Sequence, residues 1–183
     1  MKLNVKEVAR PALTLFVICF VMTLLLALTH QLTKNQAEQI KRQSEAQSQK
    51  MVLTEATSFE TKDNAYAVGK NGGKVVGYVF TTKSKSYGGD ISVMTGVSKA
   101  GKVTGVVILS SNDTPGLGLN AEKDSFRDQY KQAVPQNGFT VIKSGTAKSG
   151  QIEALTGATI TSKAVTSCVN QALAAYQKVK GGD

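Results

Sequence analysis

Residues that build metal sites and disulfide networks are scarce in this sequence. Its 183 residues include two cysteines, Cys19 and Cys168, and one histidine. Two thiols are too few for a disulfide framework or a thiolate-ligated metal cluster, and one histidine argues against a histidine-based metal site. Cys19 lies in an apolar N-terminal run and Cys168 in a predicted C-terminal helix, so we expect no disulfide between them. We expect Cys168 to be a small core residue rather than a reactive thiol.

Acidic residues are also few. Thirteen Asp and Glu stand against 22 Lys and Arg, which gives a formal net charge of +9. Such an excess can indicate nucleic-acid binding. Here the lysines are dispersed from Lys2 to Lys180, with no basic cluster interleaved with aromatic residues, so we expect no specific nucleic-acid site. No side chain stands out as a general acid or base, and we predict no catalytic residue.

Formal charge is absent from one long segment, the 23 consecutive residues from Pro11 to Thr33. As a helix this segment reaches about 34 Å at ~1.5 Å per residue, enough to cross a hydrocarbon core of ~30 Å. The competing interpretation is a cleavable signal peptide. Its apolar core is typically ~7–15 residues long, and Ala27 with Thr29 would make a poor cleavage site. We therefore predict a retained transmembrane helix over residues 11–33.

Basic residues beside the span give its expected orientation. Lys6 and Arg10 abut one end, whereas only Lys34 abuts the other. This bias favours a cytoplasmic N-terminus, residues 1–10, and an extracytoplasmic C-terminal part. Residues 34–51 are rich in Gln, Lys, Glu and Ser, which predicts a polar helical stalk.

The remaining residues, 52–183, are typical of one folded α+β domain, an antiparallel sheet with packed helices. β-branched and aromatic runs predict a meander, with Lys70-Asn71-Gly72-Gly73 as its strongest hairpin signal. Helical spacing predicts one helix that ends at Pro135 and a second at the C-terminus. The expected strands are 65–68, 75–82, 91–97, 103–109 and 139–142, and the expected helices are 121–134, with Asn120 as N-cap, and 159–179.

Two glycine-containing segments of this domain are candidate binding elements. Thr114-Pro115-Gly116-Leu117-Gly118 has Pro and Gly placed as in a type II turn, and its second glycine would let backbone approach a flat ligand. Thr156-Gly157-Ala158-Thr159 precedes the last helix, where free N–H groups and the helix dipole favour a phosphate. Physical reasoning alone leaves an ordinary turn and an ordinary helix cap open as alternatives.

Three segments, in this order, resemble the FMN-binding domain family, whose flavin is esterified through its phosphate to a threonine. They are Ser86-Tyr87-Gly88-Gly89-Asp90-Ile91, then Asn112-Asp113 with the Thr114 to Gly118 segment, then Glu153 to Ser162. Glu153 and Thr156 stand where the family commonly has Asp and Ser, and Asn112-Asp113 where His-Glu or Gly-Glu is frequent. A span followed by about 150 residues looks like the G subunits of Rnf (Rsx) ion-translocating electron transport complexes. The C subunits of sodium-pumping NADH:quinone reductases, usually longer, are the second choice.

The resemblance implies a membrane-anchored flavoprotein subunit of a bacterial cytoplasmic membrane. A flavinyl transferase would attach FMN to Thr159, and the flavin would carry electrons between reduced ferredoxin and NAD, coupled to export of Na⁺ or H⁺. The implied partners are the other membrane subunits, and the isolated chain would catalyse no substrate reaction. The implied site residues are Thr159 as the attachment point, with Thr156, Gly157, Ala158, Thr161, Tyr87, Gly88, Thr114, Pro115, Gly116, Leu117 and Gly118 around the cofactor.

Two other classes of function stay open from the sequence. A membrane-tethered scaffold domain without a cofactor would account for the span and the stalk, but not for the glycine segments. A self-standing flavin reductase would use the same site as an enzyme. The intact mass of the protein made in its own host separates the scaffold from the flavoproteins, and turnover of a small acceptor would favour the reductase.

Overall fold

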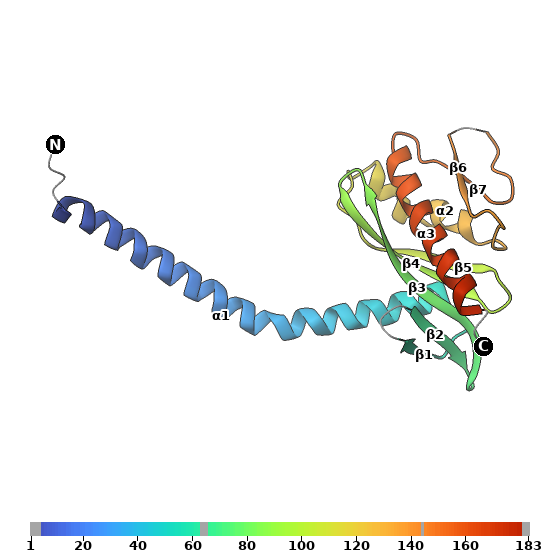
Figure 1. Ribbon diagram of the computed structural model, residues 1–183, viewed down its shortest axis with the longest axis horizontal. Coiled ribbons are helices and arrows are strands. Elements are labelled where there is room, and N and C mark those ends of the chain that lie inside the picture. The colour runs from blue at the N-terminus through green and yellow to red at the C-terminus, as the bar shows by residue number, and fades with distance from the viewer. Residues whose placement is uncertain (1–4, 63–65, 144, 181–183) are drawn as a thin grey trace. The chain divides into compact units, whose positions relative to one another are not determined.

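The computed structural model describes residues 5–62, 66–143 and 145–180. The chain divides into two compact units, with the boundary between Glu45 and Ala46. The first unit is most of one long helix, and the second contains the strands and the remaining helices (Figure 1). The α+β class expected from the sequence is confirmed.

The long helix α1 (Val5–Val52) includes both the predicted span and the predicted stalk. By length and composition it could cross a membrane, and its most apolar part is not buried inside the protein. Threonine hydroxyls in this part donate to the carbonyl oxygen four residues earlier, as Thr23 does to Cys19 at 2.6 Å. Each of these hydroxyls thus has a hydrogen-bond acceptor within the helix itself. A polar group needs such a partner wherever its surroundings are apolar.

The second unit is built on a five-stranded antiparallel meander in the order β1-β2-β3-β4-β5. These strands are β1 (Ser58–Lys62), β2 (Tyr66–Asn71), β3 (Lys74–Ser86), β4 (Gly89–Ser98) and β5 (Val103–Ser110). Four of the predicted strands correspond to β2 to β5; Ala65, the expected first residue of β2, lies outside the described residues. The predicted hairpin at Gly72 and Gly73 is confirmed as a two-residue turn with φ of 56° and 81°.

Two strands were not expected from the sequence. β1 is an edge strand whose side chains are mostly exposed. Its sequence therefore lacks the alternation of apolar and polar residues that predicts a strand. β7 (Gln151–Glu153) is three residues long, too short for a pattern. It pairs in parallel with β6 (Thr140–Ile142), which corresponds to the predicted strand at 139–142.

The helix predicted over residues 121–134 is wrong as a single element. The chain forms three short pieces instead: η1 (Gly118–Glu122), α2 (Asp124–Arg127) and η2 (Asp128–Tyr130). Asn120 lies inside η1 and does not cap a helix. The residue before α2 is Lys123, whose extended backbone (ψ 144°) separates the pieces.

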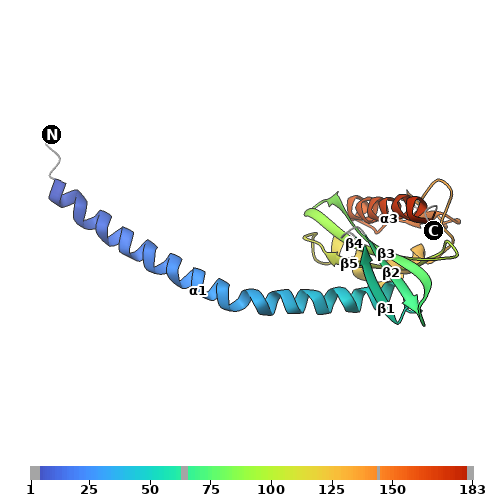
Figure 2. The ribbon, with the colours of Figure 1, turned by 60° about the horizontal axis from the view of Figure 1, so that its bottom comes forward.

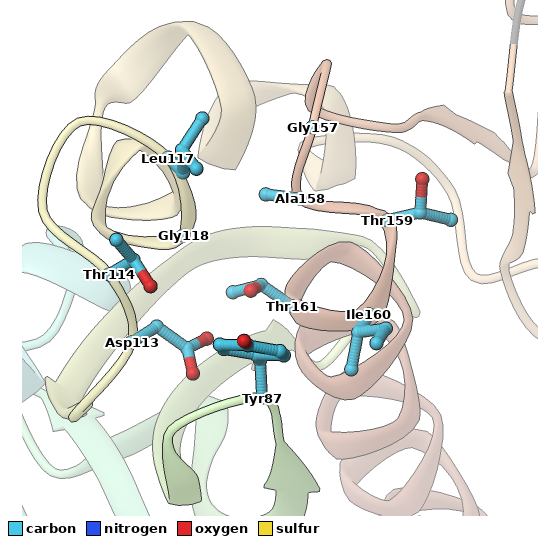
Figure 3. Close-up of a pocket in the computed structure, with 10 residues that line it drawn as sticks. All are labelled: Tyr87, Asp113, Thr114, Leu117, Gly118, Gly157, Ala158, Thr159, Ile160 and Thr161. Carbon is cyan, nitrogen blue, oxygen red and sulfur yellow. The ribbon is translucent and has the colours of Figure 1, made fainter.

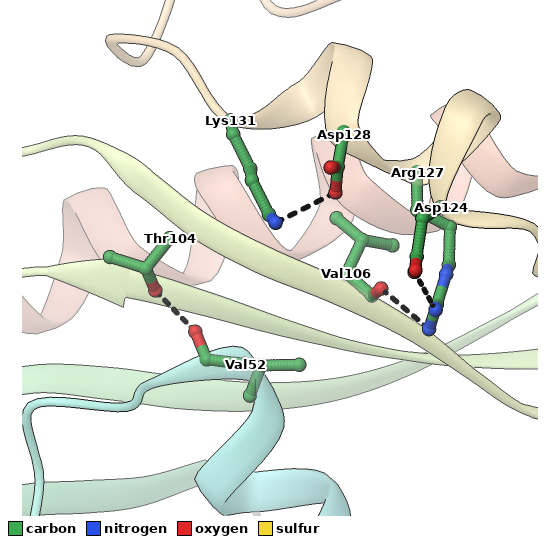
Figure 4. Close-up of polar contacts among 7 residues, drawn as sticks. All are labelled: Val52, Thr104, Val106, Asp124, Arg127, Asp128 and Lys131. Atoms are coloured by element: carbon green, nitrogen blue, oxygen red, sulfur yellow. Dashed lines mark hydrogen bonds and ion pairs between the residues drawn. The ribbon is translucent and has the colours of Figure 1, made fainter.

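Contacts with β5 explain why the predicted helix is broken. The Val103 N–H donates to the Gln132 carbonyl at 3.0 Å, so the chain after η2 runs beside the strand end instead of continuing as a helix. Arg127 donates to the Val106 carbonyl at 3.4 Å and pairs with Asp124 (Figure 4). These groups cover the edge of β5, and this tertiary pairing overrides the local helical spacing.

The C-terminal helix α3 (Thr159–Lys180) is confirmed, and it packs across β3 and β4 (Figure 2). Its buried stripe, which includes Val165, Val169 and Tyr176, forms the main core with one face of the sheet. Cys168 is fully buried in this core. Both cysteines are free, as expected.

The end of α1 belongs to the folded domain. Val52 and Leu53 are fully buried in a second apolar cluster, formed with sheet residues such as Met94. Glycines allow this close approach: a Cβ at Gly96 would meet the Val52 carbonyl, and one at Gly105 would lie 2.8 Å from Val52 Cα. The Thr104 hydroxyl donates to the Val52 carbonyl (Figure 4). The C-terminal end of α1 is thus fastened to the sheet.

Candidate functional site

Three chain segments surround a pocket of about 580 Å³. They are the turn between β3 and β4, the loop after β5, and the loop that leads into α3. This volume falls within the range of about 300–1,000 Å³ that small-molecule sites occupy. The pocket is lined by Tyr87, Asp113, Thr114, Leu117, Gly118, Gly157, Ala158, Thr159, Ile160 and Thr161 (Figure 3).

Most of the residues that the sequence singled out line this pocket, and four do not. Thr156 lies at a smaller neighbouring hollow, and Gly88, Pro115 and Gly116 lie in the surrounding turns. The structure adds two lining residues that were not chosen as site residues, Asp113 and Ile160. Asp113 belongs to the second of the three segments that resemble the FMN-binding domain family, and Ile160 directly follows Thr159 in the third.

Two glycines bring the three segments together. A Cβ at Gly88 would overlap the Asn112 backbone. A Cβ at Gly118 would lie 2.5 Å from Asp113 Cβ and 2.9 Å from Thr161 Oγ1. Gly118 therefore lets the loops approach one another, whereas the sequence suggested that it lets backbone approach a ligand.

The Thr114 to Leu117 segment is a type II turn that presents a side chain to the pocket. The Leu117 N–H donates to the Thr114 carbonyl at 3.2 Å, and Gly116 has a φ of 77° at the third position of the turn. The Asn120 side chain donates to the Gly116 carbonyl at 2.6 Å, which secures the turn. Leu117 then stands at the pocket wall.

Ser162, which ends the third segment but was not among the implied site residues, holds the loop that leads into α3. Its hydroxyl accepts the Leu155 N–H and donates to the Ala158 carbonyl, each at 3.0 Å. Thr159 is the first residue of α3 and is half-buried. In Figure 3 its side chain lies at one side of the pocket and points outward, while Ala158 and Thr161 point between the loops. Unpaired N–H groups of the first helical turn and the helix dipole favour an anion near Thr159.

The rim of the pocket is apolar and exposed. Among the described residues outside α1, the exposed large hydrophobic side chains are Tyr87 (72% exposed), Leu117 (46%) and Ile160 (56%), and all three line the pocket. Apolar surface gathered around a pocket is typical of a place that a flat ligand covers. Within residues 5–62, 66–143 and 145–180, no group of three or more His, Cys, Asp or Glu could hold a metal ion.

Asp113 is a buried charge in this pocket, with 4% of its surface exposed. Its carboxylate accepts the Gly88 N–H at 2.6 Å and the Ser86 hydroxyl. Burial by itself would raise the pKa of Asp113, but hydrogen bonds from Ser86, Thr161 and Gly88 outweigh burial and hold this pKa below its usual value. The group is therefore a carboxylate at neutral pH.

Two family profiles match this chain. The profile of the FMN-binding domain matches residues 86–174, which include the whole pocket. The profile of the RnfG N-terminal region matches residues 1–55, which include the long apolar segment.

Relatives match nearly the whole chain. The G subunit of the Na⁺-translocating ferredoxin:NAD⁺ oxidoreductase complex from Acetobacterium woodii is 38% identical over 95% of this chain and 94% of that protein. The G subunit of the proton-translocating ferredoxin:NAD⁺ oxidoreductase complex from Clostridium ljungdahlii is also 38% identical, over 92% of this chain and 91% of that protein. The G subunit of an ion-translocating oxidoreductase complex from Methanosarcina acetivorans is 29% identical over 92% and 94%.

Two crystal structures share the fold. The C subunit of the Na⁺-translocating NADH-quinone reductase from Parabacteroides distasonis superposes with a TM-score of 0.54 at 24% identity, over 63% of this chain and 61% of that chain. NqrC from Shewanella oneidensis superposes with a TM-score of 0.51 at 21% identity, over 64% of each chain. At these identities the likeness concerns the fold alone.

Proposed function

The chain belongs to the family of G subunits of Rnf-type ion-translocating ferredoxin:NAD⁺ oxidoreductase complexes, and we propose that it is a membrane-anchored subunit that carries electrons through a covalently bound FMN. The observation that carries the proposal is the pocket. Its lining comes from all three segments that resemble the FMN-binding family, and it includes Thr159. A scaffold domain without a cofactor leaves this pocket and its exposed apolar rim unexplained.

The residues of the pocket fit FMN at both of its ends. Thr159 offers a hydroxyl for a phosphoester at the start of a 22-residue helix, where the dipole favours the phosphate charge. Tyr87, Leu117 and Ile160 offer apolar surface for the flat ring. FMN supplies reversible uptake and release of electrons, and the protein supplies its placement and its electrostatic surroundings.

A covalent bond to Thr159 suits a domain outside the cytoplasm. Such a domain cannot draw on the cytoplasmic FMN pool, and an ester bond removes loss of the cofactor by dissociation. A flavinyl transferase is the implied maturation partner. The long apolar helix would place the chain in the cytoplasmic membrane, with residues 1–10 inside and the FMN domain outside.

The other subunits of the complex are the proposed electron donors and acceptors. The relatives at 38% identity are named for Na⁺ in one case and for protons in the other, so the proposal covers export of either ion. The alternative, that the chain is the C-type component of an NADH-quinone reductase, has support from the fold only.

Intact mass of the full chain, made in a host with a flavinyl transferase, tests the attachment. We expect wild type to carry one FMN and Thr159→Ala to carry none. The change deletes one hydroxyl and a methyl group at a helix start, so its stability cost should be at most that of a lost cap, about 0.5–2 kcal/mol.

Thr140→Ala is the control, because Thr140 is exposed and lies outside both the pocket lining and the three segments that resemble the FMN-binding family. It should keep the FMN mass and the fluorescent band on a denaturing gel. A flavin band that survives in Thr159→Ala would place the attachment elsewhere, and an unmodified wild-type chain would favour the scaffold.

A further inference from the structure

Asp113 connects all three segments that form the pocket. It belongs to the loop after β5, and it accepts hydrogen bonds from Ser86 and Gly88 at the β3–β4 turn. Thr161, in the first turn of α3, is its third hydrogen-bond partner. A side chain that only fastens loops need not be charged, because a neutral amide could also accept the Gly88 N–H, although less strongly than a carboxylate, and hydroxyls can rotate to suit it.

The charge of Asp113 stands alone among the pocket-lining side chains. Of the ten lining residues, it is the one that is ionised at neutral pH. The ion pair beside the β3–β4 turn, Lys85 with Asp90 at 2.9 Å, is mostly exposed, and solvent screens it. A charge that is 4% exposed acts through a medium of much lower dielectric constant than water.

We propose that Asp113 is a positioning and tuning residue of the flavin site, whose fixed negative charge lowers the reduction potential of the bound flavin. The proposal rests on the proposed function, since it needs FMN in this pocket. Reduction that brings more electrons than protons adds negative charge to the ring. A carboxylate in the same pocket opposes that gain, so the protein with Asp113 holds electrons less tightly and passes them on more readily.

The charge and the fastening role can be separated by substitution. Asp113→Asn keeps the size of the side chain and an oxygen for the Gly88 N–H, but removes the charge. Ser86→Ala removes one hydrogen bond to the carboxylate and keeps the charge. Asp128→Asn makes the same chemical change at an exposed position outside the pocket, where Asp128 pairs with Lys131.

The experiment is a redox titration of the full chain in detergent, after intact mass has confirmed one FMN per chain. We expect a higher midpoint potential at pH 7 in Asp113→Asn, and midpoints close to wild type in Ser86→Ala and Asp128→Asn. Asp113→Glu, which restores the charge, should return the midpoint toward wild type. A merely structural role predicts instead that Ser86→Ala and Asp113→Asn shift the midpoint alike.

A flavinylated Asp113→Asn protein with the wild-type midpoint overturns the inference and leaves the proposed function intact. Absence of FMN from wild type overturns the proposed function itself. If Asp113→Asn does not fold, as judged by circular dichroism, Thr114→Asp serves instead. Thr114 is exposed and lines the pocket, so an added carboxylate there should lower the midpoint, and an unchanged value counts against charge control in this pocket.

Discussion

Gly116 and Gly118 lie two residues apart and are glycines for different physical reasons. Gly116 has a φ of 77° and open space where a Cβ would be, so the backbone conformation alone requires glycine. At Gly118 the reason is space, because Asp113 and Thr161 occupy the place of a Cβ. The first requirement belongs to the turn, and the second belongs to the contact between loops.

Substitutions should separate these two reasons. We expect Gly116→Ala to lower the free energy of unfolding by about 1–2 kcal/mol, the cost of a left-handed backbone, and Gly116→Asn to recover much of it. Gly118→Ala should cost about 1–3 kcal/mol through overpacking, and Gly118→Asn at least as much. Chemical denaturation of the full chain measures all four. Recovery of stability by Asn at position 118 would contradict the steric explanation.

Cys168 should react slowly with alkylating reagents in the folded protein. It is fully buried, and burial raises the pKa of its thiol to about 11, so little thiolate exists at pH 8. In a Cys19→Ala background, labelling should be slow without denaturant and fast with it. Rapid labelling of the folded protein would show that the core around α3 opens readily.

The last turn of α1 is a structural part of the domain that follows it. Its carbonyl at Val52 is fastened by Thr104, and Leu53 is fully buried against the sheet. The sheet accommodates it because Gly96 and Gly105 have no side chains to hold it off. Composition predicted a domain that begins at residue 52, and the structure shows the contacts by which Val52 and Leu53 pack on the sheet.

Truncation of Leu53 tests the attachment of the helix end. Leu53→Ala should destabilise the domain by about 2–5 kcal/mol, as expected for a large-to-small change in a core. Met51→Ala is the matched control, because Met51 is 49% exposed two residues earlier. It should change the free energy of unfolding by about 0.5 kcal/mol or less. Equal effects in the two variants would mean that the helix end is not packed as described.

The reason proposed for covalent attachment of FMN depends on the side of the membrane on which the FMN domain lies. If the N-terminus is cytoplasmic, a reporter enzyme that works only outside the cytoplasm should be active when fused to the C-terminus. The same reporter fused after a chain shortened to residues 1–10 lacks the span and should be inactive. Protease added to intact spheroplasts should remove the FMN domain. A reporter active only in the cytoplasm would reverse the proposed orientation.

Local sequence patterns predicted much of the fold. The runs that became β2 to β5 alternate or are β-branched, and the Gly72-Gly73 turn has its own chemistry. The stripe of α3 follows from helical spacing over 22 residues. A helix was expected over residues 121–134 because Phe126 and Tyr130 have helical spacing. This prediction failed because the residues after Tyr130 pair with the end of β5 instead of continuing a helix.

The sequence by itself determined the α+β class, the apolar segment and the resemblance of the three segments to a flavin-binding family, and this resemblance led to the prediction of Thr159 as the attachment point. These depend on composition, on periodicity and on short motifs, which are local properties of the chain. Only the tertiary structure decided that Tyr87, Leu117 and Ile160 form one rim and that Asp113 lies buried among the three segments. Burial and hydrogen bonding of a carboxylate depend on residues distant in sequence, here Ser86 and Thr161, so no local pattern could reveal its charge state.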